Sequence, residues 1–415
     1  MTPAPQAATP LDRQDERLIQ PAGPRAVAGS FARRVRDGDV GSLPVVIGLL
    51  FIAVIFQALN STFLAPANLV NIAGDCVAVG VIALGLVPVL LTAQIDLSVG
   101  SMSGIGSTLL GIGLVVHGWP AWEAVAAALA AGVVTGLVYG AVFVRFGVPS
   151  FVVTLAGLLS LLGLQLKLLG TNGSINIPFS TFIVRFTQQM YLPRPASYVI
   201  SAVIAAAYLA AALARNRRRH AANLSTRPLA GDAARSAALL AGLLFACWYL
   251  NRDRGIPASF ALLIALVAIL HYLLTRTLWG RAVFAVGGSV EGARRAGLKV
   301  NRVYVSVFVI CSFLAALGGL LAAGRLASAS ISSGVGDTNL DAIAAAVIGG
   351  TSLFGGRGSA YSALLGIMVI QSIASGLTLL NLDSSVRYMI TGGVLMVAVI
   401  VDSIARRSRA AHGRG

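Results

Sequence analysis

Charged residues are scarce in this chain of 415 residues, since Asp, Glu, Lys and Arg together make up 11% of it. A soluble globular domain carries about 25% charged residues. The composition is instead apolar, with 57% hydrophobic residues and a mean hydropathy of +0.83. This balance excludes an ordinary soluble enzyme or a string of soluble domains, and it predicts an integral membrane protein.

Lysine is rarer still, and this rarity argues against a nucleotide-hydrolysing site built on a phosphate-binding loop. The chain has two lysines, Lys167 and Lys299, and neither follows a glycine-rich loop. Residues 350–355 have the glycine spacing of a phosphate-binding loop, but Gly356 stands where that loop requires its lysine. We therefore predict that the chain does not hydrolyse ATP itself.

Cysteine and histidine are also few. The three cysteines, Cys76, Cys247 and Cys311, lie in apolar runs without the spacing of a metal site, and the four histidines are scattered. No nucleophile or acid–base pair stands out in the sequence. We therefore expect buried free thiols, no metal, no cofactor and no catalytic residues.

Long apolar runs dominate the sequence. We identify about twelve of them, most near the length that crosses a bilayer. They lie near residues 43–59, 72–92, 99–116, 121–144, 151–169, 197–214, 236–250, 256–275, 303–323, 341–354, 360–376 and 388–404. Their number predicts an all-α, polytopic transmembrane helical bundle of about 10–12 spans. A short echo between residues 107–112 and 362–367 leaves open two pseudo-repeated halves.

The net charge of +16 could indicate nucleic-acid binding, but its distribution indicates membrane orientation. With the N-terminus inside, most of the 31 lysines and arginines fall in segments predicted to be cytoplasmic, including 215–235 and 276–302. We therefore expect a disordered cytoplasmic tail over 1–40, a membrane domain over 41–405 and a basic cytoplasmic tail over 406–415. Both termini would lie in the cytoplasm, and no nucleic acid would bind.

A basic polar island over residues 280–302 separates two apolar runs. It predicts a short helix with Ser289 as N-cap, Glu291 in the first turn and Gly297 at a left-handed end. Its apolar positions recur every three residues, at Val290, Ala293 and Ala296. A helix with such a face could dock into a groove of a partner protein.

The short segment between the second and third apolar runs carries Asp96, a costly residue at membrane depth. One interpretation makes Asp96 a cap of the next helix at the cytoplasmic interface, with help from Ser98. The other makes the segment a broken helix whose polar groups line a water-filled path. Asp75 and Lys167 could face the same cavity, and Asn172 supplies an amide near the outer end of the fifth run. Uncharged amides and hydroxyls suit a sugar or polyol.

Three motifs together carry a family resemblance. They are IDLSVGS at 95–101, GRAVFAVGGSVEGARRAGLKVNRV at 280–303 and LDAIAAAVIGGTSLFGGRGS at 340–359. In this order they resemble the permease subunits of ribose-type bacterial ABC sugar importers. In that family the middle motif is the cytoplasmic coupling segment that contacts the ATPase subunit. The resemblance assigns this role to Gly287, Gly288, Glu291, Ala293, Arg294 and Gly297, although Ser289 and the pair Arg295-Ala296 depart from the usual pattern.

An added basic loop over 215–236 and an added apolar run before 251–257 resemble the longer, xylose-type permeases of the family. The resemblance implies an inner-membrane permease for a pentose, with xylose as our prediction. It would form half of a homodimeric pore and work with a cytoplasmic ATP-binding subunit and a periplasmic sugar-binding protein. The alternative is a secondary transporter driven by an ion gradient. That mechanism needs an ionisable relay, for which Asp75, Asp96 and Lys167 are the candidates.

Overall fold

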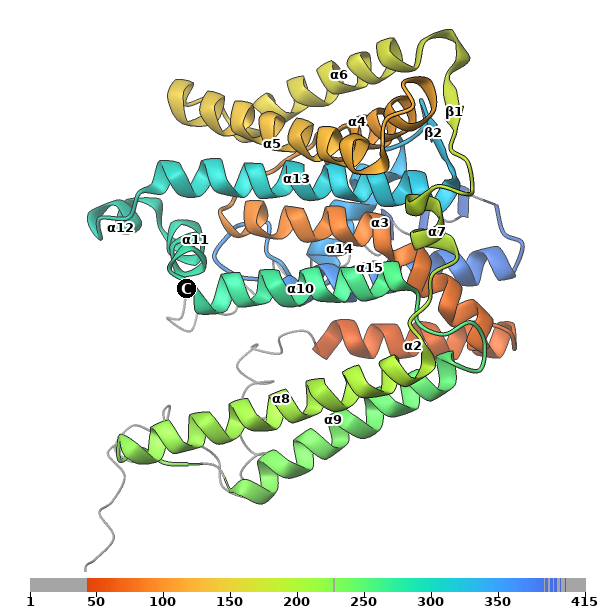
Figure 1. Ribbon diagram of the computed structural model, residues 1–415. Helices are drawn as coiled ribbons and strands as arrows, with labels where there is room; N and C mark the ends of the chain where they lie inside the picture. The colour runs from red at the N-terminus through yellow and green to blue at the C-terminus, as the bar shows by residue number, and fades with distance from the viewer. Residues whose placement is uncertain are drawn as a thin grey trace, which may run out of the picture. The chain divides into compact units, whose positions relative to one another are not determined.

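The computed structural model describes residues 43–226 and 228–383, together with positions 385, 386, 389, 390, 392, 393, 396 and 400. The predicted tails over 1–40 and 406–415, and most of the predicted span 388–404, lie outside the described residues. Among the described residues, nine helices are long and apolar enough to cross a membrane. A tenth apolar helix, α2 (Leu43–Leu59), has 17 residues. The prediction of an all-α polytopic bundle is confirmed (Figure 1).

The chain divides into two compact units, and each is described here by itself. The described part of the smaller unit, 192–255, is a hairpin of α8 (Arg194–Ala221) and α9 (Leu229–Leu250). Polar bonds join the two helices, because Ser236 Oγ donates to Ala205 O at 2.9 Å and Asn216 Nδ2 donates to Asp232 Oδ2 at 2.9 Å. Such bonds hold helices together where lipid offers no hydrophobic drive.

The predicted basic loop of this hairpin is shorter than expected. Residues 215–221 continue α8, and α9 begins at Leu229. The prediction of a loop over 215–235 is therefore wrong at both ends. The basic side chains of the last turn of α8 lie where the negative end of the helix dipole favours them, which explains why the helix continues.

The larger unit holds the remaining elements, and α13 runs through its middle, between α5 and α3 (Figure 1). Its helices are α2, α3 (Pro66–Leu91), α4 (Val99–Gly111), the π-helical turn η2 (Ile112–Val116), α5 (Ala121–Phe146), α6 (Ser150–Leu169), the 3-10 turn η3 (Gly170–Asn172), α7 (Phe182–Gln188), α10 (Ala258–Arg276), α11 (Leu278–Gly288), α12 (Val290–Arg295), α13 (Val300–Leu326), α14 (Asp337–Ile348) and α15 (Ala360–Leu379). Two short strands, β1 (Ser174–Asn176) and β2 (Ser328–Ser330), pair antiparallel with Ile175 opposite Ala329.

Glycines bring α13 into backbone contact with its neighbours. Along α5, Gly132, Gly136 and Gly140 face α13, and a Cβ at Gly132 would come within 2.7 Å of a carbonyl oxygen of α13. On the other side, Gly319 of α13 lies so close to α4 that a Cβ there would overlap the Ser103 carbonyl oxygen. Small residues permit this close approach between membrane helices.

The predicted span 341–354 is not a full span. Helix α14 has 12 residues, so it is about 18 Å long, well short of the ~30 Å hydrocarbon core. It ends at a glycine pair, where Gly350 has a φ of 107°, and the loop 349–359 leads into α15. The glycine-rich run therefore ends α14 and separates it from α15.

The hairpin of the smaller unit allows a test of the predicted orientation of the chain. The turn after α8 and the turn after α9 lie at opposite ends of these helices, so they are expected on opposite sides of the membrane. Cysteines introduced as Ala222→Cys and Arg252→Cys occupy exposed positions in these turns, while the three native cysteines are buried. An impermeant maleimide should label Arg252→Cys in intact spheroplasts, and Ala222→Cys only after permeabilisation. The reverse pattern would show that the positive-inside assignment is wrong.

The crossing of α13 and α4 predicts a stability difference between two glycine positions. Gly319→Ala should lower the free energy of unfolding by about 1–3 kcal/mol, because the added methyl meets backbone that cannot rotate away. The matched change Gly163→Ala on α6 adds a methyl to open space and should leave stability unchanged or slightly higher. Thermal unfolding in detergent measures both, and equal midpoints for the two variants would contradict the packing.

Candidate functional site

The segment 92–98 is a non-helical break between α3 and α4. Neighbouring helices bond its exposed backbone groups. From α6, Ser150 Oγ accepts from Ile95 N at 3.3 Å and Thr154 Oγ1 accepts from Leu97 N at 3.1 Å. From α14, Asn339 Nδ2 donates to Leu97 O at 2.8 Å. Irregular backbone is tolerated in a membrane protein where protein groups satisfy it in this way.

Asp96 lies at the centre of this break and is fully buried. Its Oδ1 accepts from Ser98 N at 2.8 Å and from Ser98 Oγ at 2.7 Å, while Oδ2 has no partner among the described residues. The carboxyl group therefore fixes the entry into α4, as a cap does, but from inside the protein. The break in the helix is present, and the full burial of Asp96 does not fit a cap at a solvated interface. That the polar groups of the break line a path stays a prediction.

A second feature, which we call the glycine junction, consists of Leu91, Gly287, Gly355 and Gly356. Gly356 N donates to Leu91 O at 2.8 Å, which ties the loop 349–359 to the end of α3. Gly287, near the end of α11, packs against both groups, because a Cβ there would overlap Leu91 O and lie 2.7 Å from Gly356 N. Gly355 abuts Ala93 in the break.

The glycine junction joins segments that lie far apart in the sequence. The second and third motifs, 280–303 and 340–359, are in direct contact there. The first motif, 95–101, lies just beyond, in the second half of the break and the first turn of α4. Sequence reasoning marked all three motifs but did not predict their contact. The available signal was the doubled glycines at 287–288 and 355–356, which permit close backbone approach.

The polar island 280–302 forms two short helices, α11 and α12. The predicted ends of the second are confirmed: Ser289 Oγ accepts from Gly292 N at 3.0 Å, and Gly297 has a φ of 76°. Glu291 pairs with Arg295 at 3.1 Å on the exposed side.

The predicted apolar face of α12 needs correction. Ala293 is 4% exposed and belongs to the core of the unit, so it does not offer a free surface. Val290 and Ala296 of the predicted face are exposed, so the correction concerns Ala293 alone. The other exposed positions of α12 and its end are Glu291, Gly292, Arg294, Arg295 and Gly297. Gly288 is also exposed, whereas Gly287 is held in the glycine junction.

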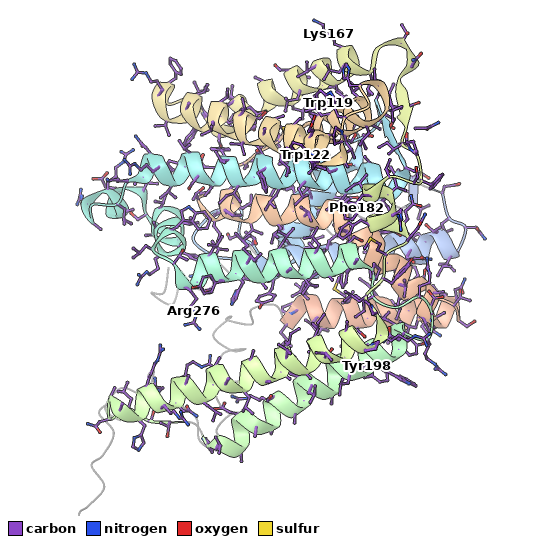
Figure 2. The ribbon with its side chains drawn as sticks, in the orientation of Figure 1. Trp119, Trp122, Lys167, Phe182, Tyr198 and Arg276 are labelled. Carbon is purple, nitrogen blue, oxygen red and sulfur yellow. The ribbon has the colours of Figure 1, made fainter. Side chains whose placement is uncertain are left out.

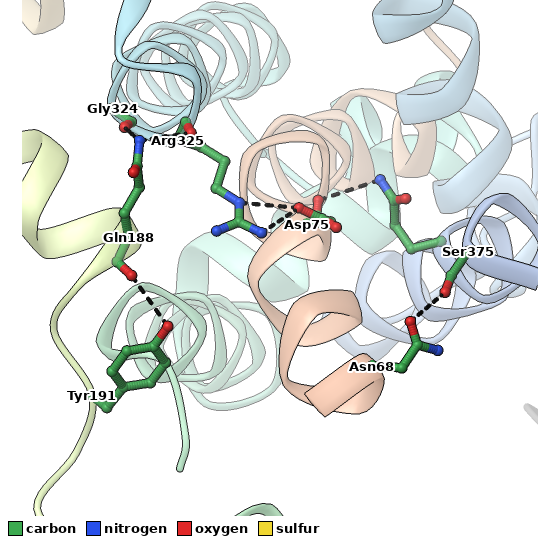
Figure 3. A network of polar contacts seen from close by, with 8 residues as sticks. Asn68, Asp75, Gln188, Tyr191, Gly324, Arg325 and Ser375 are labelled. Carbon is green, nitrogen blue, oxygen red and sulfur yellow. Dashed lines mark hydrogen bonds and ion pairs between the residues drawn. The ribbon is translucent and has the colours of Figure 1, made fainter. Parts of the chain in front are cut away.

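The structure does not gather the remaining predicted pathway residues around Asp96. Asp75 on α3 forms an ion pair with Arg325 on α13 at 2.9 Å (Figure 3). Lys167 points away from α6 into the surroundings (Figure 2), and Asn172 is exposed in η3. Sequence reasoning missed Arg325 as a partner, because a single arginine near the end of an apolar run is typical of a side chain that reaches the membrane surface.

The position of Asp96 predicts a graded mutational series. Asp96→Asn keeps an oxygen for the Ser98 bonds and should reduce transport, whereas Asp96→Leu removes both bonds and should abolish it. Both proteins should still reach the membrane, which immunoblotting of membrane fractions checks. If Asp96 served only to cap α4, the loss would be about 1 kcal/mol of local stability, and near-normal transport by Asp96→Leu would show this.

Comparison with known proteins shows the family to which the chain is similar. Residues 68–399 match the family described as branched-chain amino acid transport system / permease component. The xylose transport system permease protein XylH of Escherichia coli K12 is 35% identical over 84% of this chain and 88% of its own length. The Haemophilus influenzae XylH is 34% identical over 87% and 96%, and the Escherichia coli ribose import permease protein RbsC is 30% identical over 86% and 92%.

No solved structure matches the chain. The family match and the relatives confirm the resemblance that the three motifs indicated. The match covers most of the chain, and the nine apolar helices agree with it. This chain is a multi-pass inner-membrane protein and belongs to the permease subunits of the xylose- and ribose-type ABC sugar importers.

Proposed function

We propose that this chain forms half of the membrane channel of a pentose importer, as a homodimer, with xylose as its cargo. A periplasmic binding protein delivers the sugar, and a separate cytoplasmic subunit binds and hydrolyses ATP. The contact of α11 with the end of α3 and the loop 349–359 at the glycine junction carries this proposal. It offers a direct mechanical route from an exposed helix to the break.

The choice of xylose rests on similarity. The relatives named as xylose permeases are 34–35% identical, and those named as ribose permeases are 30% identical. The longer form of the chain, with α8 and α9, supports the same choice, since it resembles the xylose-type permeases.

We assign the coupling role to α12 and its flanks, which include Gly288, Glu291, Arg294 and Gly297. These residues are exposed. In the proposed orientation they face a partner on the cytoplasmic side. Ala293 anchors α12 to the core, and Gly287 anchors α11 to the glycine junction. In this proposal a push on α12 passes through Ser289 to α11, where Gly287 meets backbone atoms of Leu91 and Gly356.

The break is the element that such a push would move. Helices are stiff, whereas the non-helical segment 92–98 is held by separate hydrogen bonds to α6 and α14. A change at Leu91 shifts one end of this segment relative to α4. Because small shifts at packed contacts are passed on rather than absorbed, the break can switch between two arrangements. In this proposal Asp96 and Ser98 set one of them and lie beside the path.

An ion-gradient mechanism is less well supported. It would need a chain of ionisable groups through the membrane domain. Asp75 pairs with Arg325, Asp96 bonds Ser98, and Lys167 is exposed on α6. These three candidates share no contact in the part of the chain that the structure describes.

Reconstitution tests the function. Proteoliposomes holding this chain and its ATP-binding subunit, supplied with ATP and the xylose-loaded binding protein, should accumulate xylose without a membrane potential. Omission of ATP, or of the binding protein, should stop accumulation. Accumulation by this chain alone, driven by a proton or sodium gradient, would overturn the proposal.

The exposed face of α12 predicts an uncoupling variant. Glu291→Arg should reduce xylose uptake and ATP hydrolysis by the reconstituted complex by about tenfold or more, because it reverses a charge at an interface. Loss of the exposed pair with Arg295 should have little effect on stability, which thermal unfolding can verify. The control is Glu123→Arg in the first turn of α5, which should leave uptake and hydrolysis unchanged. Normal uptake by Glu291→Arg would remove the coupling role from α12.

A further inference from the structure

The ion pair of Asp75 and Arg325 is unusual because it is partly open to the surroundings within the helical bundle. Asp75 lies in the first half of α3, and Arg325 lies in the last turn of α13, at the end opposite α12. Arg325 Nε and Nη2 donate to Asp75 Oδ1 at 3.0 and 2.9 Å (Figure 3). The side chains keep relative exposures of 47% for Asp75 and 30% for Arg325.

Polar neighbours extend this pair into a polar face across three helices. From α15, Gln371 Nε2 donates to the Asp75 carbonyl at 3.3 Å, and Ser375 Oγ donates to Asn68 Oδ1 at 2.9 Å (Figure 3). Charged and amide groups in membrane spans are costly against lipid, and they face water or other protein. This face of α3, α13 and α15 is therefore not a lipid-facing surface in the working transporter.

The hydrogen bonds of the pair leave specific groups unused. Both guanidinium donors go to the same oxygen, so Asp75 Oδ2 and Arg325 Nη1 have no protein partner among the described residues. Gln371 Oε1 likewise has no hydrogen bond within the described part of the chain. Two acceptors and one donor therefore lie together on an exposed polar face.

This set of groups suits neighbouring hydroxyls. One hydroxyl of a vicinal diol donates to a carboxylate or amide oxygen, while the next accepts from a guanidinium N–H. The opposite charges of Asp75 and Arg325 balance each other. A ligand for this pair therefore needs no charge of its own, and a neutral polyol can form these bonds. Hydrogen bonds to charged groups are also stronger than those between neutral groups.

We propose that Asp75, Arg325 and Gln371 form a hydroxyl-binding subsite that holds the sugar during its passage through the permease. This inference rests on the proposed function and adds a defined site to it. The subsite makes the permease itself a contributor to the choice of cargo, beyond the binding protein that delivers it.

Direct binding tests the subsite without transport. The purified complex of this chain with its ATP-binding subunit, without the binding protein, is titrated with D-xylose and followed by saturation-transfer difference NMR. Wild-type protein should give a saturable signal. Gln371→Leu, which keeps the ion pair, and Arg325→Lys, which keeps the charge but loses the fork, should each weaken the affinity roughly tenfold.

The matched control is Thr378→Val on the same helix, since this hydroxyl bonds its own helix at Ala374 O and lies outside the subsite. It should bind xylose as the wild type does. Equal thermal unfolding of all variants separates lost binding from lost folding. Wild-type affinity in both Gln371→Leu and Arg325→Lys, or no saturable signal in any protein, would overturn the subsite.

The same preparations separate the two proposals when they are reconstituted for ATP-driven uptake. Saturable, subsite-dependent binding without ATP-driven uptake would keep the subsite and reject the importer function. The opposite result is ATP-driven uptake by the wild type, with binding and uptake unchanged in both Gln371→Leu and Arg325→Lys. It would keep the importer function and reject the subsite.

Discussion

The backbone of segment 92–98 can leave the helix only because other helices satisfy its polar groups. Inside a bilayer no water is at hand for free N–H and C=O groups, and each unsatisfied group is costly. Ser150, Thr154 and Asn339 supply these bonds from α6 and α14. Two elements distant in sequence are thereby fixed to one short segment, and the break cannot change shape without them.

Glycine contacts give the larger unit its stiffness. Along α13, backbone meets backbone at α5 on one side and at α4 on the other, so few flexible side chains intervene. Gly287 repeats this arrangement at the end of α11, against Leu91 and Gly356. Under the proposed coupling role, a force applied to α12 acts through α11 and is taken up where the chain is not helical. This arrangement makes a mechanical link between subunits physically reasonable.

Polar groups in the membrane domain follow two different patterns. Asp96 is buried and bonded within its own turn, which suits a structural role in the break. Asp75, by contrast, pairs with an arginine and remains partly exposed, with donors and acceptors left over. In the sequence both are carboxylates in or beside apolar runs. Only their surroundings in the structure distinguish Asp96, with its structural role, from Asp75, the proposed sugar-binding residue.

Local patterns determined much of this protein. Apolar runs predicted the helices, and the Ser289 cap and Gly297 predicted the ends of α12, because these signals depend on residues close in the chain. The extents of α8 and α14 were misjudged, since hydropathy alone does not show where a helix stops. Only the tertiary structure decided that Gly287 meets Leu91, that Ala293 faces inward and that Asp75 pairs with Arg325. These contacts join residues far apart in the chain, and their geometry depends on how whole helices pack.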